Sequence, residues 1–238
     1  LGDSHGNVVH LFERDCSLQR RHQKLVEESP SPILTPELRK VMCGMAIRGA
    51  KKIGYESSGT IEFLVDQDLN FYFIEMNTRI QVEHTVTEMV TRLDLVKEQI
   101  RVAAGEKLGF KQEDIHLLGH ALECRINAED VEAGFRPCPG TITYVHLPGG
   151  PGIRVDTHVY QGYSIPQHYD SLIAKIIAHG RDRAEALQRM KRALRECIIE
   201  GVKTTIPFLQ DLLSHEVVVN GKADTTFVER LSAREGPK

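Results

Sequence analysis

The sequence predicts an α+β fold in two parts, with a boundary near residue 115. Strand-like runs flanked by turn residues alternate with stretches that begin at helix-capping residues, a pattern typical of mixed folds. After LGFKQEDIH the chain changes character, because turns rich in proline and glycine, such as PCPG and LPGGPG, separate the strand-like runs. We therefore expect one unit in residues 1–115 and a second α+β unit in residues 116–238.

Capping residues define the main helix of the first part. Thr35 is its predicted N-cap, Pro36 occupies its first position, and Gly54 ends it. The preceding segment SPSPILTP holds three prolines, which exclude a helix there. In chain order we expect a strand at 7–12, an extended segment at 20–28, a helix at 35–53, hairpin strands at 60–65 and 71–76, and a helix at 94–105.

The second part is expected to combine strands with one long helix. The helix covers DRAEALQRMKRALREC and begins at the capping residue Asp182. The expected strands lie at 120–128, 141–147 and 173–179. This order of elements is typical of an α+β domain rich in turns.

Composition excludes several classes of protein. The chain has 238 residues, 41% of them hydrophobic, and a net charge of −3, so we expect no general attraction to nucleic acid or to an anionic membrane. The five cysteines are widely separated without a CxxC pair, which indicates neither a zinc site nor a disulfide framework. We expect a reducing, cytoplasmic location, without signal peptide or membrane span. The start at Leu1 in LGDSHGN suggests a piece of a longer polypeptide.

Two acidic residues are predicted to face each other across the hairpin. If Asp68 and Leu69 form a two-residue loop, Glu62 lies opposite Glu75, and Leu64 lies opposite Phe73. Directly opposed carboxylates repel each other unless a cation or a shared proton lies between them, and Mg²⁺ or Mn²⁺ suits such oxygen ligands. The alternative is an exposed hairpin face that merely happens to be acidic. The apolar residues expected on the same face, Leu64, Phe71 and Phe73, favour a ligand site.

Polar residues continue this pattern beyond the strand. Glu75, Asn77, Arg79, Gln81 and Glu83 follow one another at every second position, so an extended segment would place them on one side. Acid, amide, cation, amide and acid in that order indicate a site for a metal, an anion and a base.

Four segments resemble one enzyme family. ERDCSLQRRHQK, GTIEFLV, FYFIEMNTRIQVEH and ALECRINAED closely resemble biotin carboxylase, the ATP-grasp component of acetyl-CoA carboxylase and of related carboxylases for pyruvate, propionyl-CoA and methylcrotonyl-CoA. The resemblance runs from Leu1 to about Leu231, and it implies the C-terminal half of an ATP-grasp domain followed by the biotin carboxylase C-terminal domain. It also implies a reaction in which ATP and bicarbonate form carboxyphosphate, whose CO₂ passes to biotin on a carrier protein.

The resemblance implies metal and nucleotide ligands. Glu62 and Glu75 match residues that hold Mg²⁺ or Mn²⁺ at the ATP phosphates, with Asn77 beside them. Lys24 matches a cation close to the reacting anions. The residues that match positions near the nucleotide are Gln19, His22, Lys24 and Leu64.

The resemblance also implies the catalytic groups. Arg79, Gln81 and the backbone of Val82 match a bicarbonate cradle, and a guanidinium can hold two oxygens of this planar anion. Glu83 matches the general base, and Arg125 matches the cation that stabilises the biotin enolate. For Arg125 alone, a structural ion pair with a nearby carboxylate, Glu123 or Glu129, is the other interpretation.

The chain departs from the family in a few places. Thr85 follows the histidine of VEH, where the family usually has a proline that would keep His84 extended, and we expect modest consequences. No Gly-rich lid and no Met-Lys-Met biotinylation signature occurs, so we expect these 238 residues alone to be inactive and biotin to arrive on another chain or segment. The QRRHQK stretch has no interleaved aromatic residues, which argues against a nucleic-acid site.

The family implies partners and leaves alternatives. The partners are a biotin carboxyl carrier protein or domain, a carboxyltransferase component and a second copy in a homodimer. Mitochondrial matrix is the expected location for a eukaryotic acyl-CoA or pyruvate carboxylase. One alternative is another bicarbonate-using ATP-grasp ligase, such as carbamoyl phosphate synthetase. The other is a non-catalytic module for dimerisation and carrier docking.

Overall fold

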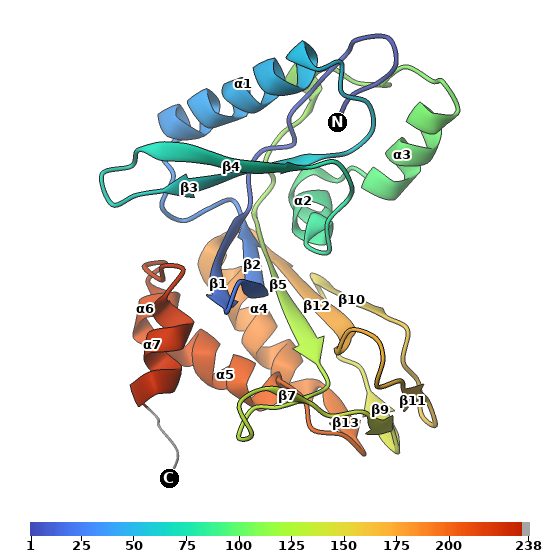
Figure 1. The fold of residues 1–238 in the computed structure, drawn as a ribbon, viewed down its shortest axis with the longest axis vertical. Helices are drawn as coiled ribbons and strands as arrows, with labels where there is room; N and C mark the ends of the chain where they lie inside the picture. Colours follow the sequence, from blue (N-terminus) through green and yellow to red (C-terminus); the bar gives the residue numbers. More distant parts are fainter. Residues whose placement is uncertain (235–238) are drawn as a thin grey trace. The chain divides into compact units, whose positions relative to one another are not determined.

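The computed structural model describes residues 1–234 and confirms a mixed α+β fold (Figure 1). It contains two compact units, the first formed by residues 1–14 and 29–118 and the second by residues 15–28 and, within the described part of the chain, 119–234. Residues 15–28 lie inside the expected first part, yet Leu18, Leu25 and Val26 are buried in the core of the second unit. The second unit therefore includes a segment from the N-terminal part of the chain, which the expected continuous division at residue 115 did not include.

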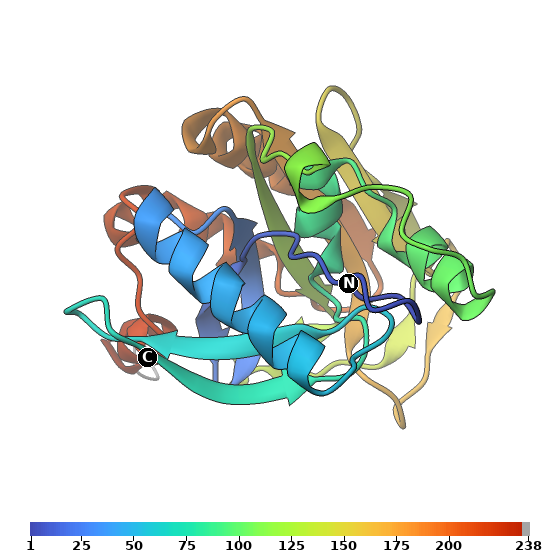
Figure 2. The ribbon, with the colours of Figure 1, turned by 90° about the horizontal axis from the view of Figure 1, so that it is seen from above.

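The first unit is built around a two-stranded ribbon. Its elements are α1 (Pro36–Lys52), β3 (Thr60–Val65), β4 (Phe71–Asn77), α2 (His84–Thr91), α3 (Leu95–Ala103) and a 3₁₀ turn (Gln112–Asp114). In both Figure 1 and Figure 2, α1 runs along the β3–β4 ribbon. The side chain of Ile61 in β3 lies close to Gly49 of α1. The ribbon that carries the acidic pair is thus supported on one side by a helix.

Local capping explains the helices that the sequence predicts. The Thr35 side chain accepts a hydrogen bond from the Leu38 amide at 3.2 Å, and Pro36 occupies the first turn of α1. Asp94 caps α3 in the same way, through the Lys97 amide at 2.9 Å. The expected strand at 7–12 is wrong, because the structure has only an isolated bridge at Val8 there.

The second unit contains a five-stranded sheet in the order β1-β2-β5-β12-β10. These strands are β1 (Asp15–Arg20), β2 (Gln23–Ser29), β5 (His120–Asn127), β12 (Leu172–Gly180) and β10 (Ile153–Thr157). The predicted helix is α4 (Arg183–Glu196), capped by Asp182. The remaining elements are β6 (Glu129–Asp130), β7 (Arg136–Pro137), β8 (Gly140–Thr141), β9 (Tyr144–His146), β11 (Ser164–Ile165), β13 (Ile198–Glu200), α5 (Ile206–Ser214), α6 (Glu216–Val219) and α7 (Phe227–Arg234).

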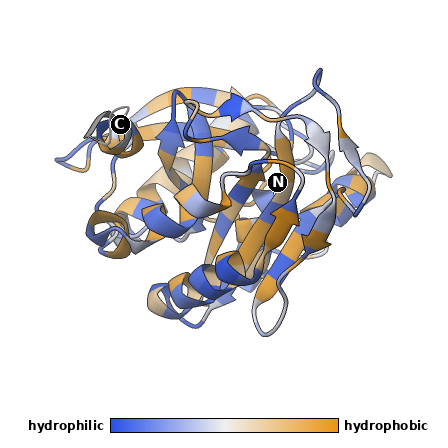
Figure 3. Cartoon of the chain, turned by 90° about the horizontal axis from the view of Figure 1, so that it is seen from below, coloured by the Kyte–Doolittle hydropathy of each residue, from blue (hydrophilic) through white to orange (hydrophobic). Residues whose placement is uncertain are grey.

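Alternation along the sheet separates an apolar face from a charged face. Leu122, Cys124 and Ile126 of β5 belong to the buried core that includes Leu187 and Leu194 of α4. The intervening residues of β5 are charged, as the strand period of two requires for opposite faces. Figure 3 shows such alternating hydrophobic and hydrophilic bands along strands of the molecule.

The segment expected to be extended at 20–28 forms strand β2 from Gln23 onward, but it belongs to a hairpin that was not predicted. Arg20 pairs with Gln23, so Arg21 and His22 form a two-residue turn. Both turn residues have positive φ, 49° and 63°, as a type I′ turn requires. Because this turn contains no Gly, Asn or Asp, it carries none of the residues by which such a turn is usually predicted.

Candidate functional site

Glu62 and Glu75 are direct partners across the β3–β4 ribbon, as the sequence predicts. The predicted pairing of Leu64 with Phe73 is wrong, because Leu64 pairs with Tyr72. The register shifts by one residue between Glu62 and Phe63, and the extra residue in β4 is Ile74. Two opposed carboxylates therefore sit immediately beside a β-bulge, a feature that locally increases the twist of the ribbon.

The pairing arises from two offsetting features. The loop spans three residues rather than two, because the Asp66 amide donates to the carbonyl of Asn70 at 2.9 Å. Leu69 adopts a φ of 62° at its end. The longer loop moves the register by one residue, and the bulge at Ile74 moves it back. Glu62 consequently meets Glu75, although the loop assumed from the sequence was wrong.

Asn77 bridges the two acids. Its Nδ2 donates to Glu62 Oε1 at 3.2 Å and to Glu75 Oε1 at 2.9 Å. The positive end of the amide dipole thus lies where a cation would satisfy both carboxylates. Rotation of the amide would turn its carbonyl oxygen toward the same point and give three oxygen ligands, the type that Mg²⁺ and Mn²⁺ prefer.

This donor set fits a divalent metal that is shared with a substrate. Within residues 1–234, no group of three or more His, Cys, Asp or Glu side chains could hold a metal by itself. Two carboxylates and one amide leave an octahedral ion short of ligands, and Mg²⁺ usually completes its shell with water and substrate phosphates. The pair is therefore suited to a metal–phosphate complex rather than to a closed structural metal site.

The surroundings of the acids differ from the expectation. The rings of Phe71 and Phe73 both contact Phe63, which follows Glu62 and so lies on the opposite face of β3. Glu75 is exposed. The expected apolar burial of the acids is therefore wrong, and their convergence on Asn77 remains the reason to consider a ligand. Leu64 does share the face of Glu62, and its side chain is 49% exposed.

The extended edge expected beyond Asn77 is also wrong. Strand β4 ends at Asn77, the chain bends at Arg79, and a turn at Val82 and Glu83 leads into α2. The bend still brings Gln81 to the acids, because its Nε2 donates to Glu62 Oε1 at 2.7 Å. Arg79 is exposed, and its two bonds are long, at 3.2 Å to the Ile80 carbonyl and 3.4 Å to Asn77 Oδ1.

Arg14 completes this network and was not predicted. Its Nη2 donates to Gln81 Oε1 at 2.6 Å and to Thr60 Oγ1 at 3.1 Å, while Nη1 donates to Thr87 Oγ1 at 3.1 Å. Because a guanidinium only donates, Arg14 fixes the oxygen end of the Gln81 amide and directs the NH₂ group toward Glu62. Arg14 and Gln81 lie 67 positions apart, so no motif spacing connects them.

Glu83 lies at the start of α2 and is only 2% exposed. It occupies the N-cap position, yet its carboxylate makes no capping hydrogen bond. His84 is the first residue of the helix, and its Nδ1 lies 2.8 Å from the Gln81 carbonyl. Thr85 is buried in the first helical turn, where proline is also tolerated.

The candidate nucleotide residues outside the ribbon belong to the β1–β2 hairpin of the second unit. Gln19 and Lys24 are direct partners across the two strands, so their side chains share one face. His22 lies in the turn between them. The hairpin thus gathers all three residues within a few positions of its tip.

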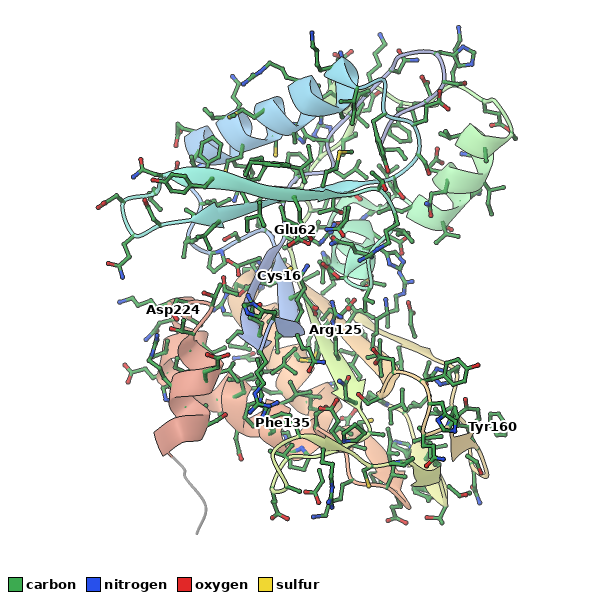
Figure 4. The ribbon with its side chains drawn as sticks, viewed as in Figure 1. Cys16, Glu62, Arg125, Phe135, Tyr160 and Asp224 are labelled. Atoms are coloured by element: carbon green, nitrogen blue, oxygen red, sulfur yellow. The ribbon has the colours of Figure 1, made fainter. Side chains whose placement is uncertain are left out.

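Arg125 lies on β5 in the second unit (Figure 4). Its Nε donates to Glu27 Oε1 at 2.5 Å, a carboxylate that differs from both candidates considered from the sequence. Of those two, Glu123 has its Oε2 3.7 Å from Lys175 Nζ, and Glu129 Oε1 accepts a hydrogen bond from the Ser171 hydroxyl. Arg125 therefore has a carboxylate partner that is 98 positions away in the chain.

Comparison with known proteins identifies the family. Residues 1–111 match the ATP-binding domain of the carbamoyl-phosphate synthase L chain, and residues 123–230 match the biotin carboxylase C-terminal domain. Over 98% of its length, the chain is 56% identical to the biotin carboxylase of Nostoc sp. (strain PCC 7120). The chain belongs to the biotin carboxylase family.

Other relatives have related names. The chain is 57% identical to biotin carboxylase 1 of Bacillus subtilis over 96% of its length. It is 58% identical over the same share to a pyruvate carboxylase subunit of Methanothermobacter thermautotrophicus. These three relatives are longer proteins, because the chain covers 52%, 51% and 46% of their lengths. It thus spans about half the length of the curated relatives it matches.

Solved structures agree with this family. The biotin carboxylase domain of a thermophilic 2-oxoglutarate carboxylase, bound to bicarbonate, superposes with a TM-score of 0.95 at 54% identity, over 97% of this chain and 52% of that one. A biotin carboxylase complex from Campylobacter jejuni gives a TM-score of 0.94 at 50% identity, over 97% and 51% of the two chains. No helix within residues 1–234 combines the length and the apolar character that a membrane crossing requires.

Proposed function

We propose that this chain supplies the metal, bicarbonate and biotin sites of an enzyme that carboxylates biotin on a carrier protein at the expense of ATP. The observation that carries the proposal is the facing pair Glu62 and Glu75, bridged by Asn77 and followed two residues later by Arg79. An acid pair beside an exposed guanidinium suits a reaction between a metal-bound polyphosphate and a small anion.

The metal site would consist of Glu62, Glu75 and the rotated amide of Asn77. Mg²⁺ or Mn²⁺ bound there would neutralise the phosphate oxygens of ATP and so favour phosphoryl transfer. Gln81 and Arg14 keep Glu62 in place through two consecutive hydrogen bonds. The nucleotide residues carried over from the family are Gln19, His22, Lys24 and Leu64, of which Leu64 offers an exposed apolar surface for the adenine.

The bicarbonate step would use Arg79, Gln81, the backbone of Val82 and Glu83. The long bonds of Arg79 are easily exchanged for two bicarbonate oxygens. Glu83 accepts the bicarbonate proton while a bicarbonate oxygen bonds to the γ-phosphorus, and ADP leaves with the electron pair of the broken bond. Burial of Glu83 reduces competition from bulk water for this proton.

Biotin would react with the CO₂ that carboxyphosphate releases. Carboxyphosphate would break down to CO₂ and phosphate, and the released phosphate would take the proton from the ureido nitrogen. Arg125 would stabilise the negative charge that develops on the ureido oxygen while the deprotonated nitrogen bonds to the carbon of CO₂. The family resemblance assigns Lys24 the role of a further cation in this reaction. Because biotin is attached to a carrier, the partners are a biotin carboxyl carrier and a carboxyltransferase component that receives the carboxyl group.

The proposed assembly is a homodimer. The related domain of Hydrogenobacter thermophilus 2-oxoglutarate carboxylase is described as a dimer in complex with MgADP and bicarbonate. We place the protein in the cytoplasm, or in the mitochondrial matrix for a eukaryotic carboxylase. None of the five cysteines forms a disulfide in the described structure.

A Glu83→Gln variant of the protein at the length of its relatives tests the proposal. We expect biotin-dependent ATP cleavage to fall by about 100-fold or more, the contribution typical of a general base, while dimerisation and carrier binding stay intact. Glu98→Gln is the matched control, because Glu98 is also a buried glutamate of the first unit and forms an ion pair with Arg101. Full turnover in Glu83→Gln would contradict the base assignment and favour a non-catalytic docking module.

The match of residues 1–111 to a carbamoyl-phosphate synthase domain makes that ligase the second candidate. The biotin carboxylase match over residues 123–230 favours the biotin reaction. Addition of free biotin distinguishes the two, because only the biotin reaction predicts a higher rate of bicarbonate-dependent ATP cleavage. Stimulation by ammonia in place of biotin would support the carbamoyl-phosphate reaction.

A further inference from the structure

The carboxylate that holds Arg125 lies at the centre of the second unit. Glu27, on β2, is fully buried at 0% exposure, whereas the Arg125 side chain on the neighbouring strand β5 retains 17% exposure. Their contact joins Nε to Oε1 at 2.5 Å. A hydrogen bond to Nε restricts the plane of the guanidinium as well as its position.

Lys175 makes this restraint necessary. It is the direct partner of Arg125 on β12, so the two positive side chains share one face of the sheet. Lys175 Nζ lies 3.7 Å from Glu123 and 3.8 Å from Asp156. Across the sheet face the two adjacent positive side chains, Arg125 and Lys175, are thus flanked by acidic residues, Glu27 on β2 and Asp156 on β10. The Glu27 carboxylate offsets the repulsion by Lys175 and draws Arg125 toward β2.

Stability alone does not account for this arrangement. Burying a carboxylate carries a desolvation cost that its ion pair often does not recover, and apolar residues of similar size can be at least as stabilising. A buried pair whose second member remains partly exposed is better suited to fix a charged group for a ligand.

We propose that Glu27 is a positioning residue that fixes the Arg125 guanidinium for the ureido oxygen of biotin. This inference rests on the proposed function. Glu27 does not touch biotin itself and acts only through Arg125. The same contact determines how well Arg125 meets the developing negative charge, so its loss affects the biotin step more than the ATP and bicarbonate steps.

The neighbouring residue provides a matched control. Glu28 follows Glu27 in β2 and therefore faces the other side of the sheet. It is also buried and also accepts a hydrogen bond from an arginine Nε, that of Arg183 at 2.7 Å. Glu27→Gln and Glu28→Gln thus remove the same charge from adjacent positions, but only the first touches Arg125.

The test measures ATP cleavage, with and without free biotin, by the enzyme at the full length of its relatives. Glu27→Gln is expected to lower the ratio of biotin-stimulated to biotin-independent cleavage by about 10- to 100-fold, the cost of a misplaced reacting group. Glu28→Gln keeps the wild-type ratio, and Glu27→Asp falls between wild type and Glu27→Gln. An unchanged ratio in Glu27→Gln, or an equal drop in both glutamine variants, would overturn the positioning role.

Two readouts separate this inference from the proposed function. A wild-type enzyme without any biotin stimulation would contradict the proposed function itself. Independently of turnover, the ¹⁵N-labelled Nε–H signal of Arg125 is expected to be protected from exchange in wild type and in Glu28→Gln, and to lose protection in Glu27→Gln or Glu27→Asp. Unaltered protection in both Glu27 variants would overturn the inference even where activity is too low to measure.

Discussion

Replacing Glu28 by glutamine tests how the second unit is held together. Glu28 Oε2 accepts a hydrogen bond from Arg183 Nε at 2.7 Å and lies 2.7 Å from His120 Nε2, while Oε1 accepts one from Arg183 Nη2 at 3.1 Å. Arg183 also donates to the carbonyls of Val218 and Val219. One carboxylate therefore links β2 to β5, to α4 and, through Arg183, to α6.

The magnitude follows from these three contacts. A hydrogen bond to a charged group contributes about 1 kcal/mol more than a neutral one, so glutamine loses about 3 kcal/mol over three bonds. Breaking a buried ion pair by removing one partner costs about 3–5 kcal/mol, which agrees. For a unit of about 130 residues, we expect the midpoint of thermal unfolding to fall by about 10 °C.

The shifted pKa of Glu28 predicts how the stability difference between wild type and Glu28→Gln changes with pH. Burial would by itself raise the pKa of Glu28, but hydrogen bonds from His120 and Arg183, aided by their charges, outweigh burial and hold the pKa below its usual 4.5. A lowered pKa in the folded state means that the carboxylate stabilises the protein above pH 4.5 and that this contribution disappears as the pH falls through the lowered value. The stability advantage of wild type over Glu28→Gln should therefore be present at pH 7 and be lost as the pH falls below 4.5 and through the lowered pKa of Glu28.

Urea and thermal unfolding of the 238-residue chain, followed by circular dichroism, measure this difference. Glu132→Gln is the control, because Glu132 is also paired with a cation, Lys203 at 3.0 Å, but its side chain is 89% exposed. We expect the control to unfold at the wild-type temperature. A Glu28→Gln protein as stable as the control at pH 7, or a stability difference that grows toward acid, would refute the reasoning.

Three further substitutions test local features. Asn77→Asp places a third carboxylate between Glu62 and Glu75. The midpoint of thermal unfolding should therefore fall in EDTA, and Mg²⁺ should raise it more than it does for wild type. Equal effects of Mg²⁺ on the two proteins would contradict the bridging geometry. Thr85→Pro should change the free energy of unfolding by less than about 1 kcal/mol, because proline is tolerated in the first helical turn; complete loss of folding would be inconsistent with that position. Leu69→Gly should stabilise the protein by about 0.5–1 kcal/mol in urea titrations, because its φ of 62° strains a non-glycine residue; a destabilised variant would count against this strain.

Local chemistry made part of the fold predictable. The helices α1, α3 and α4 were predicted because Thr35, Asp94 and Asp182 cap them through their own side chains, which a sequence displays directly. The β1–β2 hairpin was missed because Arg21 and His22 adopt the left-handed conformation without the usual turn residues. Packing of the hairpin into the second unit overrides the low preference of arginine and histidine for the left-handed conformation.

The parts of the candidate site that could be predicted are those formed by residues close together in the chain. Glu62 and Glu75 belong to one hairpin, and their pairing survived a wrong loop only because the bulge at Ile74 offsets it. Residues 78–83 keep the alternating pattern of a strand but form a bend and a turn, since no further strand pairs with them. The Arg14–Gln81 and Glu27–Arg125 contacts span 67 and 98 positions, and no period within one sequence encodes such distances.

The central claim is that Glu62 and Glu75 converge on one divalent cation. The most direct test is to measure Mn²⁺ binding by electron paramagnetic resonance in the presence of ATP. The protein used is the enzyme at the full length of its relatives. We predict that Glu62→Gln and Glu75→Gln each weaken Mn²⁺ binding by about 10-fold or more, whereas Glu98→Gln binds like wild type. Wild-type Mn²⁺ affinity in both acid variants would contradict the claim.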